Sequence, residues 1–260
     1  MLHLWHNLNE EWMLEQIKVG AVSYLNTRPL LYGIRQSAIL MQQIELIEDY
    51  PANIANMLMD GRIDIGLVPV AIIPKINNAQ IISDFCIGAE GNVASVGLFS
   101  DVPVEEIEEV ILDYQSRTSV NLARILLQQY WKLNPIFTPA GTDFIAQIKG
   151  TTAAIIIGDR ALAHRNKTRY MYDLAGSWKA MTGLPFVFAA WVANKPLPDT
   201  FIEAFNSANA LGMAEIDAVI KEINYPLYDV RTYFTQNISY RLTPEKLKGL
   251  DLFLEMLGKL

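Results

Sequence analysis

Small polar side chains gather in three loops of the chain, and each loop follows an apolar, β-prone run. The loops have the sequences SYLNTRP (residues 23–29), GAEGNVASV (88–96) and DYQSRTSVN (113–121). In open α/β sheets, ligands bind beyond the carboxyl ends of the strands, where loops and helix N-termini present unpaired N–H groups. The three loops are therefore the candidate site. The first would supply neutral hydrogen-bonding groups from Ser23, Asn26 and Thr27.

The third loop has the composition of an anion site. Ser116, Arg117, Thr118 and Ser119 place hydroxyls and a cation at the expected start of a helix. Backbone N–H groups and the positive end of the helix dipole favour an anion there, and a carboxylate fits as well as a phosphate. The alternative is an ordinary helix start that is capped by Thr118 or Ser119, with Arg117 in solvent.

Two acidic residues are further candidates. Asp159 follows an apolar run and precedes a helical pattern, so it would either cap that helix or contact a ligand. Glu90 lies in the glycine-bounded sequence GAEG and is either a general base or a turn residue. The chain has no GxGxxG, no Walker loop and no HExxH, and its three histidines lie outside the candidate loops. We therefore expect chemistry without a metal or other cofactor.

Charge and cysteine content restrict the partners and the location. With 28 acidic and 21 basic side chains and no Lys/Arg run, the surface repels nucleic acid and anionic lipid. The single cysteine, Cys86, excludes an intrachain disulfide and suits a reducing compartment. No segment approaches the roughly 18 consecutive apolar residues of a membrane span, and the N-terminus does not have the pattern of a secretory signal. We expect a cytoplasmic protein without a membrane partner.

The first twelve residues precede both Met13 and the first expected strand. They are either a start-site extension outside the fold or a short docked helix that carries Leu4 and Trp12. The sequence leaves both possibilities open, so the start is either Met1 or Met13.

Helical patterns alternate with β-prone runs at residues 17–25, 63–70, 94–100, 109–114, 153–159 and 185–193. This alternation predicts an α/β protein with largely parallel sheets. After residue 198 the pattern is helical to the end, and no further strand is expected. The runs at residues 94–103 and 186–196 are long and apolar enough to pass between two lobes. We therefore predict one lobe from residues 1–99 plus 196–260 and an inserted second lobe from residues 100–195.

Six segments, in order, resemble the chorismate dehydratase family of menaquinone biosynthesis by the futalosine route. They are VGAVSYLNTRPLLYGI, DIGLVPVA, CIGAEGNVASVGLFSDVPVEEI, LDYQSRTSVNLARILL, AAIIIGDRAL and YDLAGSWKAMTGLPFVFAAW, within residues 17–195. The resemblance implies a fold like that of type II periplasmic binding proteins, in which two α/β lobes enclose a ligand cleft. Arg28 departs from the family pattern, because many relatives carry an apolar residue there.

The resemblance also implies roles for residues. Asn26 and Ser95 match the catalytic positions of the family, and the loop at residues 116–119 would hold a carboxylate of the substrate. The expected substrate-binding set is Ser23, Thr27, Ser116, Arg117, Thr118, Ser119, Gly158 and Asp159.

The family reaction removes water from chorismate, a dicarboxylate, and gives 3-[(1-carboxyvinyl)oxy]benzoate without a cofactor. Three acceptors for the ring proton stay open at this point: Glu90, Asp159 and a carboxylate of the substrate itself. The alternative function is a non-catalytic protein of the same fold that binds or senses an aromatic or other small carboxylate.

Overall fold

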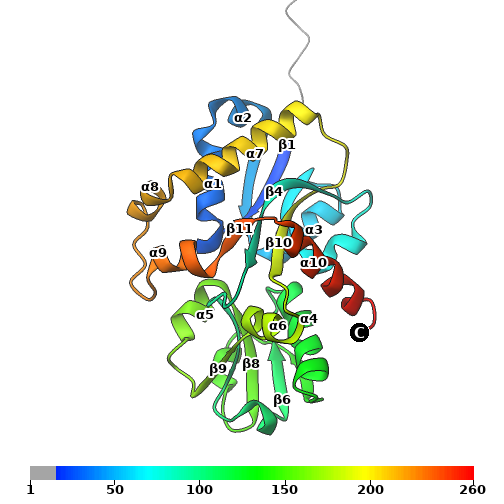
Figure 1. Cartoon of the computed structure of the whole chain (residues 1–260), viewed down its shortest axis with the longest axis vertical. Coiled ribbons are helices and arrows are strands. Elements are labelled where there is room, and N and C mark those ends of the chain that lie inside the picture. The colour runs from blue at the N-terminus through cyan, green and yellow to red at the C-terminus, as the bar shows by residue number, and fades with distance from the viewer. Residues whose placement is uncertain (1–15) are drawn as a thin grey trace, which may run out of the picture.

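A computed structural model describes residues 16–260 and divides them between two sheets that are flanked by helices. Figure 1 shows the sheets as two lobes, with β1, β4 and β10 in the upper lobe and β6, β8 and β9 in the lower one. This arrangement confirms the predicted two-lobed α/β fold. The two possibilities for residues 1–12 lie outside the described residues.

The first lobe contains a six-stranded sheet with the order β11-β4-β10-β3-β1-β2. Its strands are β1 (Ile17–Val22), β2 (Ile44–Asp49), β3 (Ile65–Pro69), β4 (Gln80–Ala89), β10 (Phe186–Ala193) and β11 (Ser239–Arg241). Its helices are α1 (Arg28–Gln36), α2 (Ala38–Gln43), α3 (Pro51–Met59), α7 (Asp199–Ala214), α8 (Ile216–Lys221), α9 (Val230–Thr232) and α10 (Pro244–Leu257). Shorter turns include η1 (Leu25–Thr27), η2 (Val70–Lys75) and η6 (Tyr233–Asn237).

The second lobe contains a five-stranded sheet with the order β7-β6-β8-β5-β9. Its strands are β5 (Val96–Ser100), β6 (Glu109–Leu112), β7 (Ile136–Pro139), β8 (Thr152–Ile157) and β9 (Tyr170–Asp173). Its helices are α4 (Thr118–Ile125), α5 (Gly158–His164) and α6 (Leu174–Thr182), with the turns η3 (Val104–Glu106), η4 (Leu126–Tyr130) and η5 (Phe144–Gln147).

Both sheets are mixed, so the prediction of largely parallel sheets is wrong. Strand β1 is parallel to β2 and β3, but β10 is antiparallel to β3 and β4. Likewise β6 is parallel to β7 and β8, whereas β5 is antiparallel to β8 and β9. A strand buried on both faces is apolar throughout, and its sequence does not indicate the direction of its neighbours. The prediction of no strand after residue 198 is also wrong, because the short β11 pairs with β4.

The chain changes lobes nearer to its N-terminus than the predicted boundaries at residues 100 and 195. Strand β5 belongs to the second lobe and β10 to the first, so the crossings lie between β4 and β5 and between β9 and β10. The physical reason is that neither apolar run is itself a crossing segment. Each is a strand with hydrogen-bonded neighbours on both sides in one sheet, and such a strand is buried on both faces.

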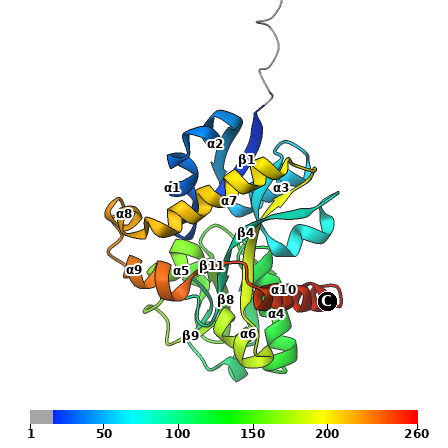
Figure 2. The same cartoon turned by 45° about the horizontal axis from the view of Figure 1, so that its top comes forward.

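Helix α1 is held close to α7 by two glycines. A Cβ atom added to Gly33 would lie 1.9 Å from the carbonyl oxygen of Ala208, and one added to Gly212 would lie 1.8 Å from that of Pro29. Only glycine permits this approach of the two backbones. Figure 2 shows the resulting pair, with α7 running alongside α1. The pair fixes the N-terminal end of α1, which carries the first candidate loop.

No helix in residues 16–260 has the length and apolar character that crossing a bilayer requires.

Candidate active site between the lobes

A cavity of about 70 Å³ lies where the two lobes meet. Its apolar wall comes from both sheets and includes Val22, Leu67, Ile87, Val96 and Phe188. Seven predicted site residues line the cavity: Asn26, Thr27, Ser95, Ser116, Thr118, Ser119 and Gly158. The three polar loops therefore converge, as their places after apolar runs predict.

Asn26 is placed by the loop that follows β1. This strand ends at Val22, and the turn η1 leads from the loop directly into α1. The backbone carbonyl of Asn26 accepts a hydrogen bond of 2.9 Å from the Tyr240 hydroxyl, and the Asn26 side-chain oxygen accepts one of 3.2 Å from Thr27. Thr27 is fully buried. The amide of Asn26 is thus anchored at the cavity by its backbone and by its neighbour.

Ser95 is presented by a strained turn. Ala94 has a φ of 66°, which is the left-handed region that residues with a side chain rarely adopt. The Asp173 carboxylate stabilises this turn by accepting backbone N–H hydrogen bonds from Val93 at 3.1 Å and from Ala94 at 2.7 Å. Arg165 donates to the carbonyl of Ala94 at 2.8 Å. Together these contacts position the fully buried Ser95 at the cavity.

Asp173 serves two elements at once. Besides the turn before Ser95, its carboxylate caps α6 by accepting hydrogen bonds from the N–H groups of Ala175 and Gly176. Burial raises the pKa of Asp173, and the backbone N–H groups and the guanidinium of Arg165 offset part of that rise. The residue is a support for Ser95, and it lies outside the set that lines the cavity.

The residue that caps the start of α4 differs from the prediction. The hydroxyl of Ser116 accepts a hydrogen bond of 3.0 Å from the backbone N–H of Ser119. The hydroxyl of Thr118 accepts one of 3.2 Å from the backbone N–H of Ala71, in the first lobe. Capping by Thr118 or Ser119 is therefore wrong, because Ser116 supplies the acceptor for the first turn. Thr118 instead joins the two lobes.

Arg117 does not line the cavity. Its guanidinium donates a hydrogen bond of 2.7 Å to the side-chain oxygen of Asn56, which lies on α3 of the first lobe. The cation expected to hold a carboxylate thus forms a contact between the lobes. The described residues that line the cavity include no Lys, Arg, His, Asp or Glu, so an anion there would meet hydroxyls, amides and the N-terminal end of α4.

A hydrogen-bonded network crosses from the first lobe to the second at Tyr24. The Tyr24 hydroxyl donates to the side-chain oxygen of Gln115, which also accepts from Arg160 at 2.9 Å, and Arg160 forms a 2.7 Å ion pair with the buried Asp113. Burial raises the pKa of Tyr24, and Arg160 opposes the rise only in part, so the phenol is neutral at physiological pH. The ring packs against Gly158, where an added Cβ would lie 3.0 Å away and φ is +64°.

The two acidic candidates lie outside the cavity lining. Asp159 accepts a hydrogen bond of 3.1 Å from the backbone N–H of Leu25, so it holds the first loop and does not cap α5. Burial raises the pKa of Asp159, while the Leu25 hydrogen bond and Arg28 oppose the rise. Glu90 has a side chain that is 55% exposed and lies 3.7 Å from the ammonium of Lys246. Neither carboxylate is among the residues that line the cavity between the lobes.

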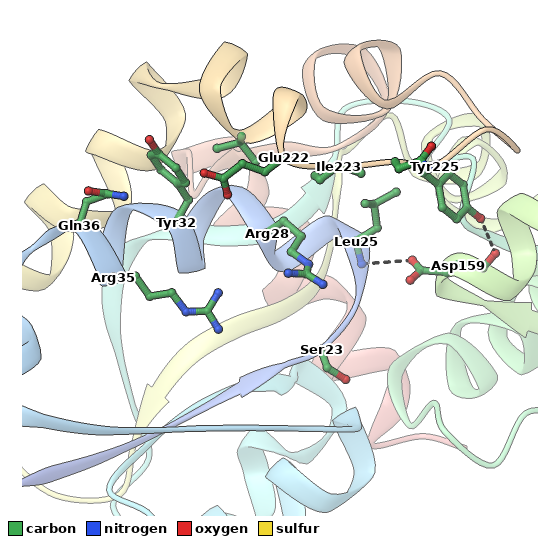
Figure 3. A pocket seen from close by; sticks show the side chains of 12 residues that line it. Ser23, Leu25, Arg28, Tyr32, Arg35, Gln36, Asp159, Glu222, Ile223 and Tyr225 are labelled. Carbon is green, nitrogen blue, oxygen red and sulfur yellow. Dashed lines mark hydrogen bonds between the residues drawn. The ribbon is translucent and has the colours of Figure 1, made fainter.

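A second cavity, of about 350 Å³, shares the first loop and takes in Ser23 and Asp159. Figure 3 shows Arg28 and Arg35 projecting from α1, with Glu222 and Tyr225 on the segment across from them. Arg35 is paired with Glu48, and the Tyr225 hydroxyl donates to the Asp159 carbonyl at 2.9 Å. Two of the predicted binding residues, Ser23 and Asp159, thus belong to this charged cavity and not to the neutral one.

The described residues bring together no group of three or more His, Cys, Asp or Glu side chains that could hold a metal ion.

Three residues that support the cavity between the lobes were not predicted from the sequence: Asp173, Tyr233 and Tyr240. No local motif marks their contacts, since each reaches a partner at least 79 residues away in the chain. Tyr233 lies in the turn η6 and Tyr240 lies in the strand β11 that follows it, and the fold brings both elements to the candidate loops.

Comparison with known protein families decides the classification. A family model described as menaquinone biosynthesis matches residues 17–259. The chain belongs to this family. One relative is the chorismate dehydratase of Thermus thermophilus, which is 26% identical in an alignment of 267 positions that covers 92% of this chain and 94% of that protein.

Solved structures share the fold of this family member. The protein AF1704 of Archaeoglobus fulgidus matches with a TM-score of 0.68 and 11% identity, over 96% of this chain and all of that one. The periplasmic aliphatic sulphonate binding protein SsuA of Escherichia coli matches with a TM-score of 0.60 and 16% identity, over 93% and 92% of the two chains. These likenesses confirm the predicted periplasmic-binding-protein-like fold.

Proposed function

We propose that this protein is a chorismate dehydratase, which removes water from chorismate to give 3-[(1-carboxyvinyl)oxy]benzoate. Membership of the menaquinone biosynthesis family and similarity to the Thermus thermophilus enzyme support this activity. The observation that carries the proposal is the convergence of Asn26 and Ser95 in one cavity that is lined by neutral hydrogen-bonding groups. A cytoplasmic location is part of the proposal and rests on the sequence, in which Cys86 is the only cysteine.

The reaction changes two neighbouring ring carbons of chorismate. The carbon that bears the enolpyruvyl ether loses a proton, and the next carbon loses its hydroxyl, which departs as water after it takes up a proton. Negative charge spreads toward the ring carboxylate before the ring becomes aromatic. A protein assists by placing donors where this charge develops, and one preorganised donor is commonly worth roughly 3 to 4 kcal/mol.

In this proposal, Asn26 and Ser95 position the enolpyruvyl group and the leaving hydroxyl by hydrogen bonding. The hydroxyls of Ser116, Thr118 and Ser119 would lie around a substrate carboxylate at the start of α4. Neutral groups suit these roles, because a dianionic substrate supplies its own charge.

The proton acceptor in this proposal is a carboxylate of the substrate. Two observations support it. No Asp, Glu or His is among the described residues that line the cavity. Tyr24 does line it, but burial raises the pKa of this phenol, so it is not a base near neutral pH.

We further propose that the lobes separate to admit the substrate. The cavity volume of about 70 Å³ is well below the roughly 300 Å³ at which pockets for small molecules usually begin. Hydrogen bonds from Tyr24 to Gln115 and from Ala71 to Thr118 join the lobes. These contacts would break on opening and form again around the bound substrate, which excludes water from the reaction.

The test is incubation of the purified protein with chorismate, followed by chromatography and mass spectrometry of the benzoate product. We expect product to form at a rate proportional to protein concentration. Calorimetry on the same sample measures binding separately. Binding of chorismate without any product would overturn the enzyme proposal and favour a binding or sensing protein for small carboxylates.

A further inference from the structure

The Ser95 hydroxyl has a buried partner that comes from the C-terminal part of the chain. Tyr233 is the first residue of η6 and is fully buried. Its hydroxyl donates a hydrogen bond of 2.7 Å to the Ser95 Oγ atom, across 138 positions of sequence. Tyr233 itself is not among the residues that line the cavity, so it acts on a ligand there through neighbours that do, Ser95 and the Asn26 side chain, with which it also interacts.

This hydrogen bond determines what Ser95 can do. A hydroxyl carries one hydrogen and two acceptor lone pairs. Because Tyr233 donates to the Ser95 oxygen, the hydrogen of Ser95 is left for another acceptor. Ser95 lines the cavity, so its hydrogen is available to a ligand there. The hydrogen bond from Tyr233 thus leaves Ser95 as a hydrogen-bond donor toward the cavity.

The direction of this hydrogen bond is maintained near neutral pH. Burial raises the pKa of Tyr233, and the hydrogen bond with Ser95 offsets the rise only in part. The phenol therefore keeps its hydrogen over the whole physiological range. The adjoining Tyr240 hydroxyl donates to the carbonyl of Asn26, so the same C-terminal segment supports both proposed catalytic residues.

We propose that Tyr233 is a positioning residue of the dehydration, because it holds the Ser95 hydroxyl as a hydrogen-bond donor to the leaving hydroxyl of the substrate. This inference rests on the proposed function. It assigns to the segment after α9 a part in the reaction that none of the sequence motifs indicates. The departing hydroxyl gains a hydrogen bond from Ser95, and Ser95 gains one from Tyr233.

The decisive variant is Tyr233→Phe, which keeps the ring and its edge contact with Tyr228 but removes the donor. We expect kcat to fall about 10-fold, as for the loss of one buried hydrogen bond, with KM nearly unchanged. The matched control is Tyr228→Phe, since the Tyr228 hydroxyl donates to Asn237 at 2.9 Å and has no contact with Ser95. The control should keep the kcat of the wild type.

A double-mutant cycle separates positioning from a general structural effect. In the Ser95→Ala background, Tyr233→Phe should lower kcat less than it does in the wild type, because the part of its effect that passes through the Ser95 hydroxyl is already lost. Independent losses that multiply in the double mutant would overturn the proposal. Replacement of Tyr233 by 4-aminophenylalanine, which retains a donor at the same place, should restore most of the lost kcat.

Other outcomes of these experiments distinguish the positioning role from the proposed function. Turnover of chorismate by the wild type together with an unchanged kcat in Tyr233→Phe overturns the positioning role alone. Absence of turnover in the wild type overturns the proposed function first, and the positioning role with it. If Tyr233→Phe does not fold, as judged by circular dichroism, the 4-aminophenylalanine variant replaces it. A kcat near that of the wild type then supports the donor role, and a loss of more than about 10-fold in the folded variant overturns it.

Discussion

The two cavities that share the first loop differ in size and in charge. The cavity between the lobes is small, about 70 Å³, and the described residues that line it carry no formal charge. The second cavity is larger, about 350 Å³, and is lined by Arg28, Arg35, Asp159 and Glu222. Size and charge alone would favour the second cavity. The residues marked by family resemblance converge in the first, and we therefore propose the first as the active site.

The largest effects should come from the neutral cavity. Ser95→Ala and Asn26→Leu should each lower kcat about 100- to 1,000-fold, since in the proposed mechanism each removes a donor to the reacting groups. Steady-state turnover of chorismate measures the effect, and circular dichroism checks the fold. Ser23→Ala is the matched control, because it makes the same chemical change in the charged cavity. If Ser23→Ala lost as much activity as Ser95→Ala, the contrast between the cavities would be wrong.

The next effect concerns the support of the neutral cavity. Asp173→Ala removes the acceptor for four backbone N–H groups around Ser95 and α6. We expect a loss of about 3 kcal/mol in the free energy of unfolding, and a Tm lower by about 6 to 12 °C, because buried donors are left without a partner.

The comparison variant for Asp173→Ala is Asp229→Ala. Asp229 caps the exposed start of α9 with a single backbone hydrogen bond from Thr232 at 2.7 Å. Its removal should destabilise the protein less than Asp173→Ala does, because only one exposed backbone N–H group loses its acceptor. Calorimetric unfolding of both variants tests the difference. Equal losses would show that Asp173 is no more than a cap of α6.

A smaller effect should follow in the charged cavity. Arg28 lines that cavity and is exposed, so Arg28→Ala should raise KM about twofold at most and leave kcat unchanged. Steady-state kinetics at low and high salt measure this, since any attraction of the dianionic substrate is screened by salt. A large fall in kcat would mean that the charged cavity takes part in the reaction.

The contrast between the cavities also shows which parts of the fold and the site can be predicted from the sequence. The family resemblance predicts the two-lobed fold, although the apolar runs expected to cross between the lobes are strands within one sheet each. The loops that follow apolar runs predict the convergence of Asn26, Ser95 and the loop before α4. That inference holds because a loop after a strand must lie at the edge of its sheet. The comparisons bear out the family and the fold.

Side-chain partners could not be predicted in the same way. Arg117 was expected at a carboxylate, yet it donates to the side-chain oxygen of Asn56 in the other lobe, a contact that no local sequence pattern indicates. Tyr233 and Asp173 reach the site only through tertiary contacts, for which a single sequence has no periodic or spacing signal. The direction of β10 was missed for a related reason, since a buried strand has the same apolar pattern in either direction.

The smallest effect is expected for Glu90→Gln, and it tests which group accepts the proton. Loss of a general base typically costs about 100- to 10,000-fold in rate, so the variant distinguishes the mechanisms clearly. Glu90 is 55% exposed and lies beside Lys246 and Ser239, outside the neutral cavity. We therefore expect kcat and KM close to those of the wild type. If Glu90→Gln abolished turnover while calorimetry still showed binding of a product analogue, the acceptor would be Glu90 and not the substrate. The lobes would then have to move Glu90 into the cavity during the reaction, and the neutral character of the cavity would describe only the arrangement without substrate.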